Sequence, residues 1–407
     1  MSVTLKKSIV NKSSAINITG SKSESNRLLL LQALYPEIHI ENLSNSDDSQ
    51  LMQKAFLGDN LLVDIHHAGT AMRFLTAYFA IQENRETILT GSSRMQERPV
   101  KILVEALQNL GADIEYVEND GFPPIKIRGK KLTKNKVTLK ANVSSQYISA
   151  LLLVASKLEN GLELTLDGEI TSVPYIKMTL SLLDQIGVKS SFVKNTIKVE
   201  KAINNQQPKT LFVESDWSSA SYFYSIVALS HIGTEVTLSY YKENSLQGDS
   251  VLAEIYISFG VQTTFEKKSV KLKKVSYYNS YFTFNLINAP DIAQTIAVTC
   301  LALGIECYLT GLHTLKIKET DRLIALKTEI AKLGGSIEVT ENSLHLSAVT
   351  RIKEYVSIAT YKDHRMAMAF APLALRVPVI IEESDVVSKS YPDFWSDLNT
   401  IGFKIEK

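Results

Sequence analysis

The sequence lacks the features that mark several classes of protein. It has two cysteines, Cys300 and Cys307, seven residues apart in an apolar stretch, so a disulfide framework is excluded and a reducing compartment is favoured. Its apolar runs fall far short of the ~18 residues of a membrane span, and the opening MSVTLKKSIV has no apolar core of a signal peptide. With 44 basic against 43 acidic residues, bulk electrostatics cannot drive nucleic-acid binding. We therefore expect a cytoplasmic protein that binds neither membranes nor nucleic acid.

Familiar catalytic motifs are missing as well. Ala15 stands where a phosphate-binding G-x-x-x-x-G-K-[ST] loop needs its first glycine, and the sequence contains no G-x-G-x-x-G and no G-x-S-x-G. The seven histidines include one close pair, His66 and His67, and adjacent histidines do not face one metal ion on regular structure. The sequence therefore predicts no metal and no cofactor.

What the sequence does contain is a long internal repeat. Six segments open with Ser, Thr or Asp in the style of a helix N-cap and then stay apolar on nearly every side for about three turns, which predicts buried helices. These segments are 21–34, 68–81, 143–156, 216–229, 290–303 and 362–375. A second, amphipathic set of segments ends on glycines 68–76 residues apart, except for a first interval of 53 residues. The 407 residues therefore divide into six α/β units of about 74 residues, the first abbreviated.

Cations stand at the N-terminal ends of many predicted helices. They are Lys22, Arg27, Arg73, Arg94, Arg98, Lys318, Arg322, Arg365 and Lys389. A cation there opposes the helix dipole by about 0.3–1 kcal/mol, whereas a bound anion would reverse the sign of the interaction. Neighbouring acidic residues such as Glu24, Glu97 and Asp321 offer the alternative of simple surface neutralisation for any one cation. For so many cations, a shared site for a polyanionic ligand is favoured.

Two carboxylates could supply acid–base chemistry in such a site. Asp291 follows Pro290 at a helix start, and Glu319 is flanked by Lys318 and Arg322. Each alone is more often a helix cap, but a carboxylate close to several cations stays ionised and suits a proton acceptor.

Eight stretches together resemble the 5-enolpyruvylshikimate-3-phosphate synthase family. They are GSKSESNRLLLL, AGTAMR, RMQERP, VSSQYISALLL, APDIAQTIA, KIKETDRL, DHRMAMAF and KSYPDF, in this order from residue 20 to residue 394. The resemblance implies an α/β fold of two domains, each of three βαβαββ units, known as the inside-out α/β barrel or enolpyruvyl transferase fold. One domain is expected at 20–215, with its first unit abbreviated, and the other at 1–19 with 216–407. The active site is expected in the cleft between them.

The resemblance also implies an activity and a set of site residues. The family transfers the enolpyruvyl group of phosphoenolpyruvate to the 5-hydroxyl of shikimate 3-phosphate and releases phosphate, in the shikimate pathway to chorismate and aromatic amino acids. The residues implied for shikimate 3-phosphate are Lys22, Ser23, Arg27, Ser144, Ser145, Gln146, Ser172, Asp291 and Lys318, and those for phosphoenolpyruvate are Lys22, Gly69, Arg94, Gln146, Arg322, Arg365 and Lys389. Asp291 matches the base, and Glu319 and Lys22 the groups near the enol methylene. We expect a monomer that glyphosate inhibits.

The sequence departs from the family pattern at three positions. His67 and Thr314 stand where many members have Asn, and Phe74 stands where Pro is common. Two alternatives remain: a UDP-N-acetylglucosamine 1-carboxyvinyltransferase and a non-catalytic anion-binding module on the same scaffold. The first uses a cysteine in a mobile loop, a place that neither cysteine occupies here. Loss of Asp291 or Glu319 would have favoured the second, and both are present.

Overall fold

A computed structural model describes residues 1–140, 144–168, 170–202, 208–277 and 280–406. The chain divides into two compact units, of which unit 1 is Met1–Thr19 with Glu214–Lys407 and unit 2 is Gly20–Val213. Unit 1 thus includes Glu214 and Ser215, which we expected at the end of the other domain. The Ser215 hydroxyl donates to the carbonyl oxygen of Ile18 at 2.5 Å, and Glu214 accepts from Trp217 Nε1 at 2.9 Å, so both side chains are bonded within unit 1.

Unit 1 contains three four-stranded sheets that share one topology. Their strand orders are β2 (Ser13–Ile16)–β13 (Glu235–Ser239)–β15 (Ser269–Lys274)–β14 (Val261–Glu266), then β16 (Tyr281–Asn285)–β17 (Glu306–Thr310)–β19 (Ser343–Leu346)–β18 (Ile337–Val339), and β20 (Val356–Ile358)–β21 (Val379–Ile381)–β1 (Val3–Lys6)–β22 (Lys404–Glu406). In each sheet the first two strands are parallel and the other pairs are antiparallel. A parallel pair needs a crossover connection, which a helix supplies.

Unit 2 repeats the same topology twice and contains a shorter third sheet. The four-stranded sheets are β4 (Leu62–Asp64)–β5 (Glu86–Thr90)–β7 (Ile125–Arg128)–β6 (Asp113–Tyr116) and β8 (Lys136–Lys140)–β9 (Leu162–Asp167)–β11 (Thr196–Val199)–β10 (Ser190–Val193). The third sheet consists of β12 (Lys209–Phe212) parallel to β3 (Ile38–Glu41). The short first interval of the sequence repeat therefore corresponds to a sheet that keeps the parallel pair. Among the described residues it lacks the two further strands, paired antiparallel, that complete each of the other five sheets.

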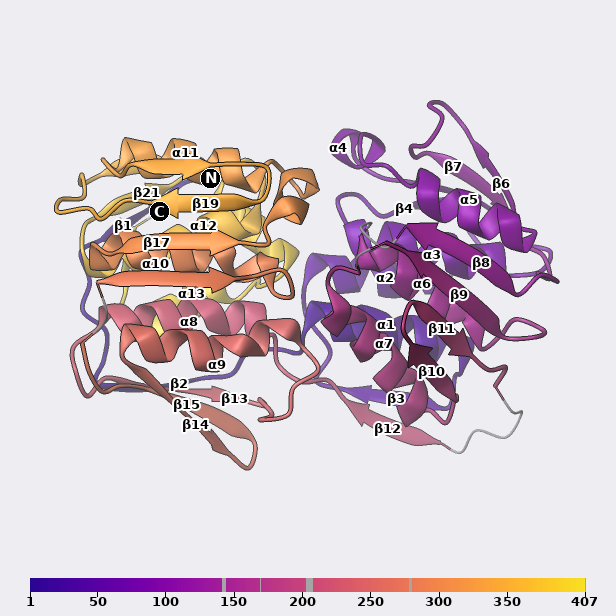
Figure 1. The fold of residues 1–407 in the computed structure, drawn as a ribbon, viewed down its shortest axis with the longest axis horizontal. Helices are drawn as coiled ribbons and strands as arrows, with labels where there is room; N and C mark the ends of the chain where they lie inside the picture. The colour runs from indigo at the N-terminus through magenta and orange to yellow at the C-terminus, as the bar shows by residue number, and fades with distance from the viewer. Residues whose placement is uncertain (141–143, 169, 203–207, 278–279, 407) are drawn as a thin grey trace. The chain divides into compact units, whose positions relative to one another are not determined.

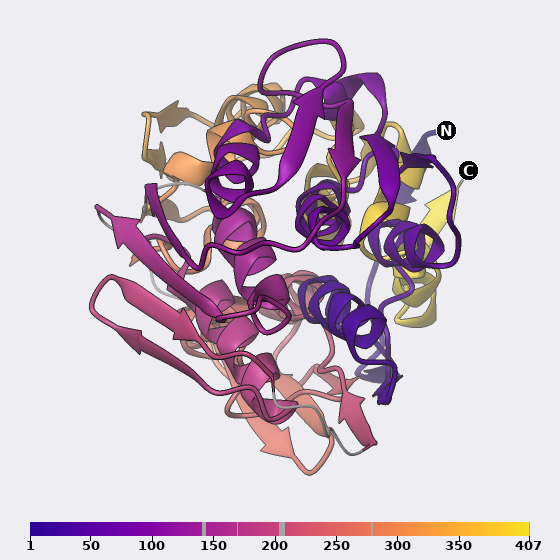
Figure 2. The ribbon, with the colours of Figure 1, turned by 90° about the vertical axis from the view of Figure 1, so that its right-hand side faces the viewer.

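The six apolar segments form the helices inside the two units, with the sheets outside them (Figures 1 and 2). They are α1 (Lys22–Leu34), α3 (Gly69–Ala80), α6 (Ser145–Ala155), α8 (Trp217–Leu229), α10 (Ala293–Leu303) and α12 (His364–Phe370). Every residue of α3, α10 and α12 is buried, as expected for helices that are apolar all round. The last predicted helix is shorter than expected, because η5 (Ala371–Leu375) continues α12 as a 3₁₀ helix around Pro372, which has no N–H to donate.

The second set of helices packs nearer the surface. It consists of α2 (Asp47–Phe56), α5 (Lys101–Leu110), α7 (Val173–Gln185), α11 (Arg322–Lys332) and α13 (Phe394–Thr400), with η1 (Gly248–Val251), α9 (Leu252–Ile255) and η2 (Tyr256–Phe259) as one irregular member. Gly111 ends α5 and Gly260 ends η2 with φ angles of 109° and 75°, a left-handed conformation that glycine adopts readily.

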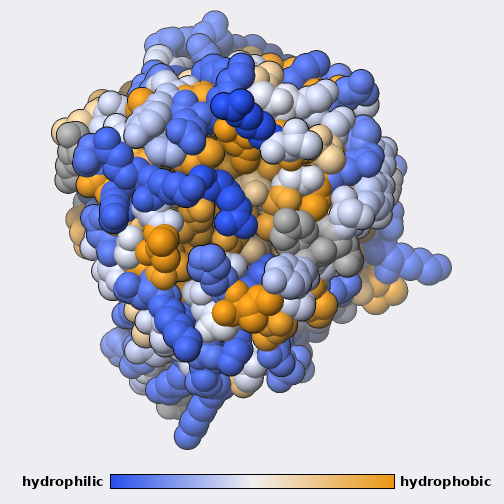
Figure 3. Space-filling model, turned by 90° about the vertical axis from the view of Figure 1, so that its left-hand side faces the viewer, coloured by the Kyte–Doolittle hydropathy of each residue, from blue (hydrophilic) through white to orange (hydrophobic). Residues whose placement is uncertain are grey.

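The outer surface is mixed in polarity. On the face shown in Figure 3, charged and polar side chains surround several separate apolar areas. In the described part of the chain, no helix is both long and apolar enough to cross a membrane.

Candidate active site

Arg322 lies at the centre of a buried charged cluster in unit 1. It is the first residue of α11, whose N-cap Asp321 accepts from the backbone amides of the first turn. Only 2% of the Arg322 side chain is exposed, and its guanidinium donates to three carboxylates: Nε to Asp363 at 2.7 Å, Nη1 to Asp291 at 2.8 Å and Nη2 to Glu319 at 2.8 Å. A planar guanidinium offers donors in several fixed directions, so one side chain can hold three acceptors.

Three further cations contact the same carboxylates. Lys318 Nζ lies 3.3 Å from Asp291 Oδ1, and Arg365 Nη2 lies 3.5 Å from Asp291 Oδ2. Lys389 Nζ, at the end of η6 (Ser384–Lys389), lies 3.2 Å from Glu319 Oε1. All six site residues that the sequence predicted in this half of the chain therefore meet in one cluster.

The charges of this cluster shift the pKa values of its members. Burial alone would raise the pKa of the Asp291 carboxyl, but Lys318, Arg365 and Arg322 outweigh burial and hold that pKa below its ordinary range. Burial alone would lower the pKa of Arg322, and its carboxylate partners raise it above the ordinary value. Asp291 is therefore ionised, and the cations that keep it ionised also make it a weak base.

Sequence reasoning missed three polar residues beside this cluster. Asp363 is fully buried, caps α12 by accepting from Arg365 N at 2.9 Å, and binds Arg322. Ser218 contacts Arg365, and Asp249 contacts Ser218. Asp363 could have been found, because it opens the DHRMAM stretch, but Ser218 and Asp249 carry no motif of their own.

In unit 2, α1 carries the predicted Lys22, Ser23 and Arg27. Arg27 is buried, and its guanidinium donates to Ser149 Oγ and Thr179 Oγ1, both at 2.8 Å, and to the Ser23 carbonyl at 2.7 Å. Burial lowers the pKa of Arg27 to about 10, so it remains a cation at neutral pH. It links the first turn of α1 to α6 and α7.

The predicted serines and glutamine lie at two helix starts. Ser144 is the N-cap of α6 and accepts from Gln146 N, and the Gln146 side chain donates to Thr70 Oγ1 at 3.2 Å. Thr70 follows Gly69, the first residue of α3. Ser172 precedes α7 in the left-handed conformation, with φ 54°. Helix starts with free amides and hydroxyls suit a phosphate or carboxylate.

The cations of the segment between Arg73 and Arg98 differ in role. Arg73 is buried and donates to the carbonyl oxygens of Gly69 at 3.1 Å and Pro99 at 2.8 Å, so it holds the backbone. Arg94, in α4 (Ser93–Gln96), pairs with Glu97 at 2.7 Å on the surface, the neutralised arrangement we weighed as the alternative. The Arg98 guanidinium lies against Gly69, where an added Cβ would come within 2.5 Å of Nη1.

Comparisons with known proteins agree on one family. Residues 54–398 match the model of EPSP synthase (3-phosphoshikimate 1-carboxyvinyltransferase). A 3-phosphoshikimate 1-carboxyvinyltransferase of Bacteroides fragilis (strain ATCC 25285) is 48% identical over 96% of both chains, and one of Haemophilus influenzae (strain PittEE) is 36% identical over 95% of this chain and 96% of its own. The chain belongs to the EPSP synthase family. A solved EPSP synthase from Acinetobacter baumannii, 20% identical, matches all of both chains with a TM-score of 0.82, which confirms the predicted fold.

Phe74, where many EPSP synthase family members have Pro, is a core residue of α3. It is fully buried within α3, which runs as one α-helix from Gly69 to Ala80. The Arg27 guanidinium lies 5.4 Å from the centre of the Phe74 ring, a distance at which a cation is attracted to an aromatic face. The Phe74 ring therefore packs against the guanidinium of Arg27, a predicted site residue.

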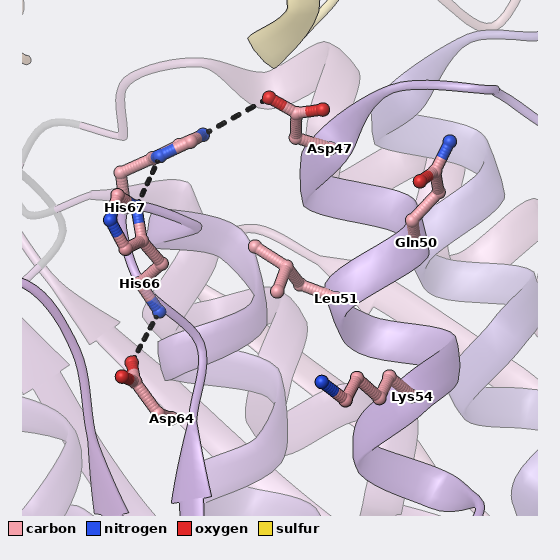
Figure 4. Close-up of a pocket in the computed structure, with 7 residues that line it drawn as sticks. All are labelled: Asp47, Gln50, Leu51, Lys54, Asp64, His66 and His67. Carbon is pink, nitrogen blue, oxygen red and sulfur yellow. Dashed lines mark hydrogen bonds and ion pairs between the residues drawn. The ribbon is translucent and has the colours of Figure 1, made fainter.

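The second departure, His67, lines a surface pocket of about 550 Å³ between α2 and the β4–α3 connection (Figure 4). The Nδ1 atoms of His66 and His67 are 2.7 Å apart, so one ring donates to the other, and His67 Nε2 lies 3.7 Å from Asp47. Among the described residues, no group of three or more His, Cys, Asp or Glu could hold a metal ion. Through its contact with Asp47, His67 links the β4–α3 connection to α2.

The third departure and the two cysteines lie in unit 1. Thr314, in η4 (His313–Ile317), has a buried hydroxyl without a hydrogen-bond partner among the described residues. Cys300 lies in α10 and Cys307 in β17, and both are fully buried. Burial raises the pKa of the Cys300 thiol well above its ordinary value, which suits a core position and not a reactive loop.

Proposed function

We propose that this protein transfers the carboxyvinyl group of phosphoenolpyruvate to the 5-hydroxyl of shikimate 3-phosphate and releases inorganic phosphate. The observation that carries the proposal is the arrangement of Asp291, Glu319 and Lys389 around Arg322. It combines two carboxylates for proton transfer with cations for an anionic substrate. The family match and the curated relatives favour this acceptor over UDP-N-acetylglucosamine.

The proposed chemistry has two steps. In the first step the 5-hydroxyl oxygen of shikimate 3-phosphate bonds to C2 of phosphoenolpyruvate, and Asp291 takes the hydroxyl proton. Glu319 or Lys22 protonates the C3 methylene, which gives a tetrahedral intermediate. The C2–O bond to phosphate then breaks, C3 loses a proton, and the carbon–carbon double bond is restored. General acid–base groups contribute about 10²–10⁴-fold each.

The anion and the base compete for the same cations. Arg322 and Arg365 both contact Asp291, and both are proposed to bind phosphoenolpyruvate. Because an anion bound to these guanidinium groups neutralises part of their charge, it raises the pKa of Asp291 towards its ordinary value. The base therefore gains strength when the substrate is in place.

Unit 2 supplies the proposed binding groups for shikimate 3-phosphate. Ser144, Ser145 and Ser172 offer hydroxyls at two helix starts, and Lys22 and Arg27 offer charge. Charge-assisted hydrogen bonds of this kind are the usual means of holding a phosphate. In this proposal the protein acts in the cytoplasm as a monomer.

The proposal is tested by phosphate release from phosphoenolpyruvate with each acceptor in turn. Release with shikimate 3-phosphate and not with UDP-N-acetylglucosamine supports it. Release with the sugar nucleotide alone would assign the other transferase activity, and binding of both anions without release would assign a binding module.

A further inference from the structure

Asp249 is a buried carboxylate beside the charged cluster of unit 1. It lies in η1, 3% exposed, and its Oδ2 accepts a hydrogen bond from Ser218 Oγ. Its Oδ1 is also buried and has no hydrogen-bond partner among the described residues. Burial of a carboxylate is unfavourable unless its charge is balanced, so the position of Asp249 calls for a compensating role.

Ser218 connects Asp249 to Arg365. Arg365 Nη2 donates to Ser218 Oγ at 3.2 Å, and Ser218 Oγ donates onward to Asp249. The same Nη2 lies 3.5 Å from Asp291 Oδ2, while Nη1 donates to the Asp291 carbonyl at 3.1 Å. The guanidinium is thus held by the proposed base and by the Ser218–Asp249 pair, both of which contact Nη2.

The segment that carries Asp249 is anchored to the helix that carries Ser218. Gln247 Oε1 accepts from Trp217 N, and Gln247 Nε2 donates to the Ser215 carbonyl, both at 2.9 Å. Since Trp217 and Ser218 open α8, these bonds fix the distance from Asp249 to Ser218. The arrangement is therefore built into the fold and does not depend on a single exposed side chain.

We propose that Asp249, acting through Ser218, is a positioning residue that orients the guanidinium of Arg365 for phosphoenolpyruvate. The inference rests on the proposed function. Held by both Asp291 and Ser218, Arg365 has fewer rotamers to lose when the anion binds, and preorganisation of this kind improves affinity.

The charge state of Asp249 adds a pH dependence to this arrangement. Burial raises the pKa of Asp249 to about 6; Arg365 and the Ser218 hydrogen bond act against burial, and Asp291 and Asp216 act with it. The carboxylate is ionised at neutral pH and becomes protonated as the pH falls through 6. The interaction that orients Arg365 therefore weakens on the acid side.

Two other roles for Asp249 predict different results. If it only supports the start of α8, then neutralising it lowers stability without a selective effect on one substrate. If its charge mainly repels the anionic substrate, then neutralising it lowers the KM for phosphoenolpyruvate. Only the positioning role raises that KM selectively.

The experiment compares wild type with Asp249→Asn and Ser218→Ala. We expect each variant to raise the KM for phosphoenolpyruvate about tenfold near pH 7.5 while the KM for shikimate 3-phosphate stays within about twofold. In wild type the KM for phosphoenolpyruvate should rise below about pH 6, and in Asp249→Asn this rise should be smaller, because only protonation of the substrate phosphate remains. Glu214→Gln is the matched control, because Glu214 is another buried carboxylate of this region that binds Trp217 and Ser245 instead of Ser218.

An unchanged or lowered KM in Asp249→Asn at all pH values would overturn the proposal, as would an equal rise in Glu214→Gln. If Asp249→Asn does not fold, Ser218→Ala decides alone. Calorimetric titration of phosphoenolpyruvate into each protein in the absence of shikimate 3-phosphate gives the same comparison without turnover. An inactive wild type would therefore refute the proposed function, while the titration would still test the role of Asp249.

Discussion

Arg322 Nη1 and Asp291 Oδ1 lie 2.8 Å apart, so the proposed base is bonded to a cation that the proposed substrate also needs. Arg322 and its neighbours hold the pKa of Asp291 below its ordinary range in spite of burial. A carboxylate with so low a pKa would be a poor proton acceptor. In the proposed mechanism, phosphoenolpyruvate bound to Arg322 therefore makes Asp291 a stronger base.

Replacement of Asp291 tests the base directly. Asp291→Asn keeps the shape of the side chain and removes its charge, so we expect kcat to fall by about 10²–10⁴-fold while both substrates still bind in calorimetry. Asp321→Asn is the control, because Asp321 is the nearby cap of α11 and accepts only from backbone amides among the described residues. Near-normal turnover in Asp291→Asn would remove Asp291 from the role of base.

Glu319 is expected to move protons at the methylene carbon. Its carboxylate contacts Lys389 at 3.2 Å and Arg322 at 2.8 Å. In D₂O with shikimate 3-phosphate present, wild type should place solvent deuterium in the methylene of recovered phosphoenolpyruvate, because protonation of C3 is reversible in the proposed mechanism. Mass spectrometry should find this exchange at least about tenfold slower in Glu319→Gln. Exchange at the wild-type rate would argue that Lys22 alone carries the proton.

The raised pKa of Asp249 predicts a pH-dependent stability. The folded-state value of about 6 exceeds the ordinary value of 3.8, so the folded state binds the extra proton and loses stability as the pH rises between these values. By linkage this loss amounts to at most about 3 kcal/mol above pH 6. We therefore expect Asp249→Asn to unfold at a higher temperature than wild type near pH 7.5 and at a similar one near pH 4. A variant less stable than wild type at both pH values would contradict the shift.

Much of the fold could be predicted from the sequence because its signals are local and repeated. Apolar segments and terminal glycines mark the helices, and their spacing gives the six units. The expected side-chain caps form at α6, α8 and α12, whereas α1, α3 and α10 begin without a side-chain cap bond. The exception is the early end of α12, where η5 begins around Pro372. A pattern of apolar residues does not reveal this effect of proline.

The site was harder to predict, because it depends on side chains far apart in the chain. The cations near Asp291 were visible as charges at helix starts, but that charge pattern alone does not separate Arg73, which holds backbone carbonyls, from Arg322, which holds carboxylates. Only the family resemblance set Arg322 apart. Ser218 and Arg365 are 147 positions apart, and an isolated Ser and Asp carry no periodic signal. Only the fold brings Asp249 to Arg365.

Glyphosate is expected to compete with phosphoenolpyruvate. At the start of α3 the Arg98 guanidinium occupies the space that a Cβ on Gly69 would need, with Nη1 2.5 Å from that position. In Gly69→Ala the new methyl group must displace Arg98, a movement that a flexible side chain allows, so we expect the fold to persist while the inhibition constant for glyphosate rises at least about tenfold. Arg98→Ala separates the two effects: if Arg98 transmits the change, Gly69→Ala adds little in that background.

The same inhibition assay tests whether Phe74 makes the protein resistant to glyphosate. Full turnover of wild type with glyphosate in large excess over phosphoenolpyruvate would contradict the expected sensitivity. Inhibition that returns in Phe74→Pro would then trace the resistance to this residue, whose ring contacts Arg27.

The most direct test of the account is the rate of phosphate release from phosphoenolpyruvate with purified wild-type protein, Asp291→Asn and Asp321→Asn, each with shikimate 3-phosphate or UDP-N-acetylglucosamine. The account predicts that wild type and Asp321→Asn release phosphate when the acceptor is shikimate 3-phosphate and not when it is UDP-N-acetylglucosamine. It predicts a rate lower by about 10²–10⁴-fold in Asp291→Asn. Release with UDP-N-acetylglucosamine instead, or equal rates in all three proteins, would contradict it.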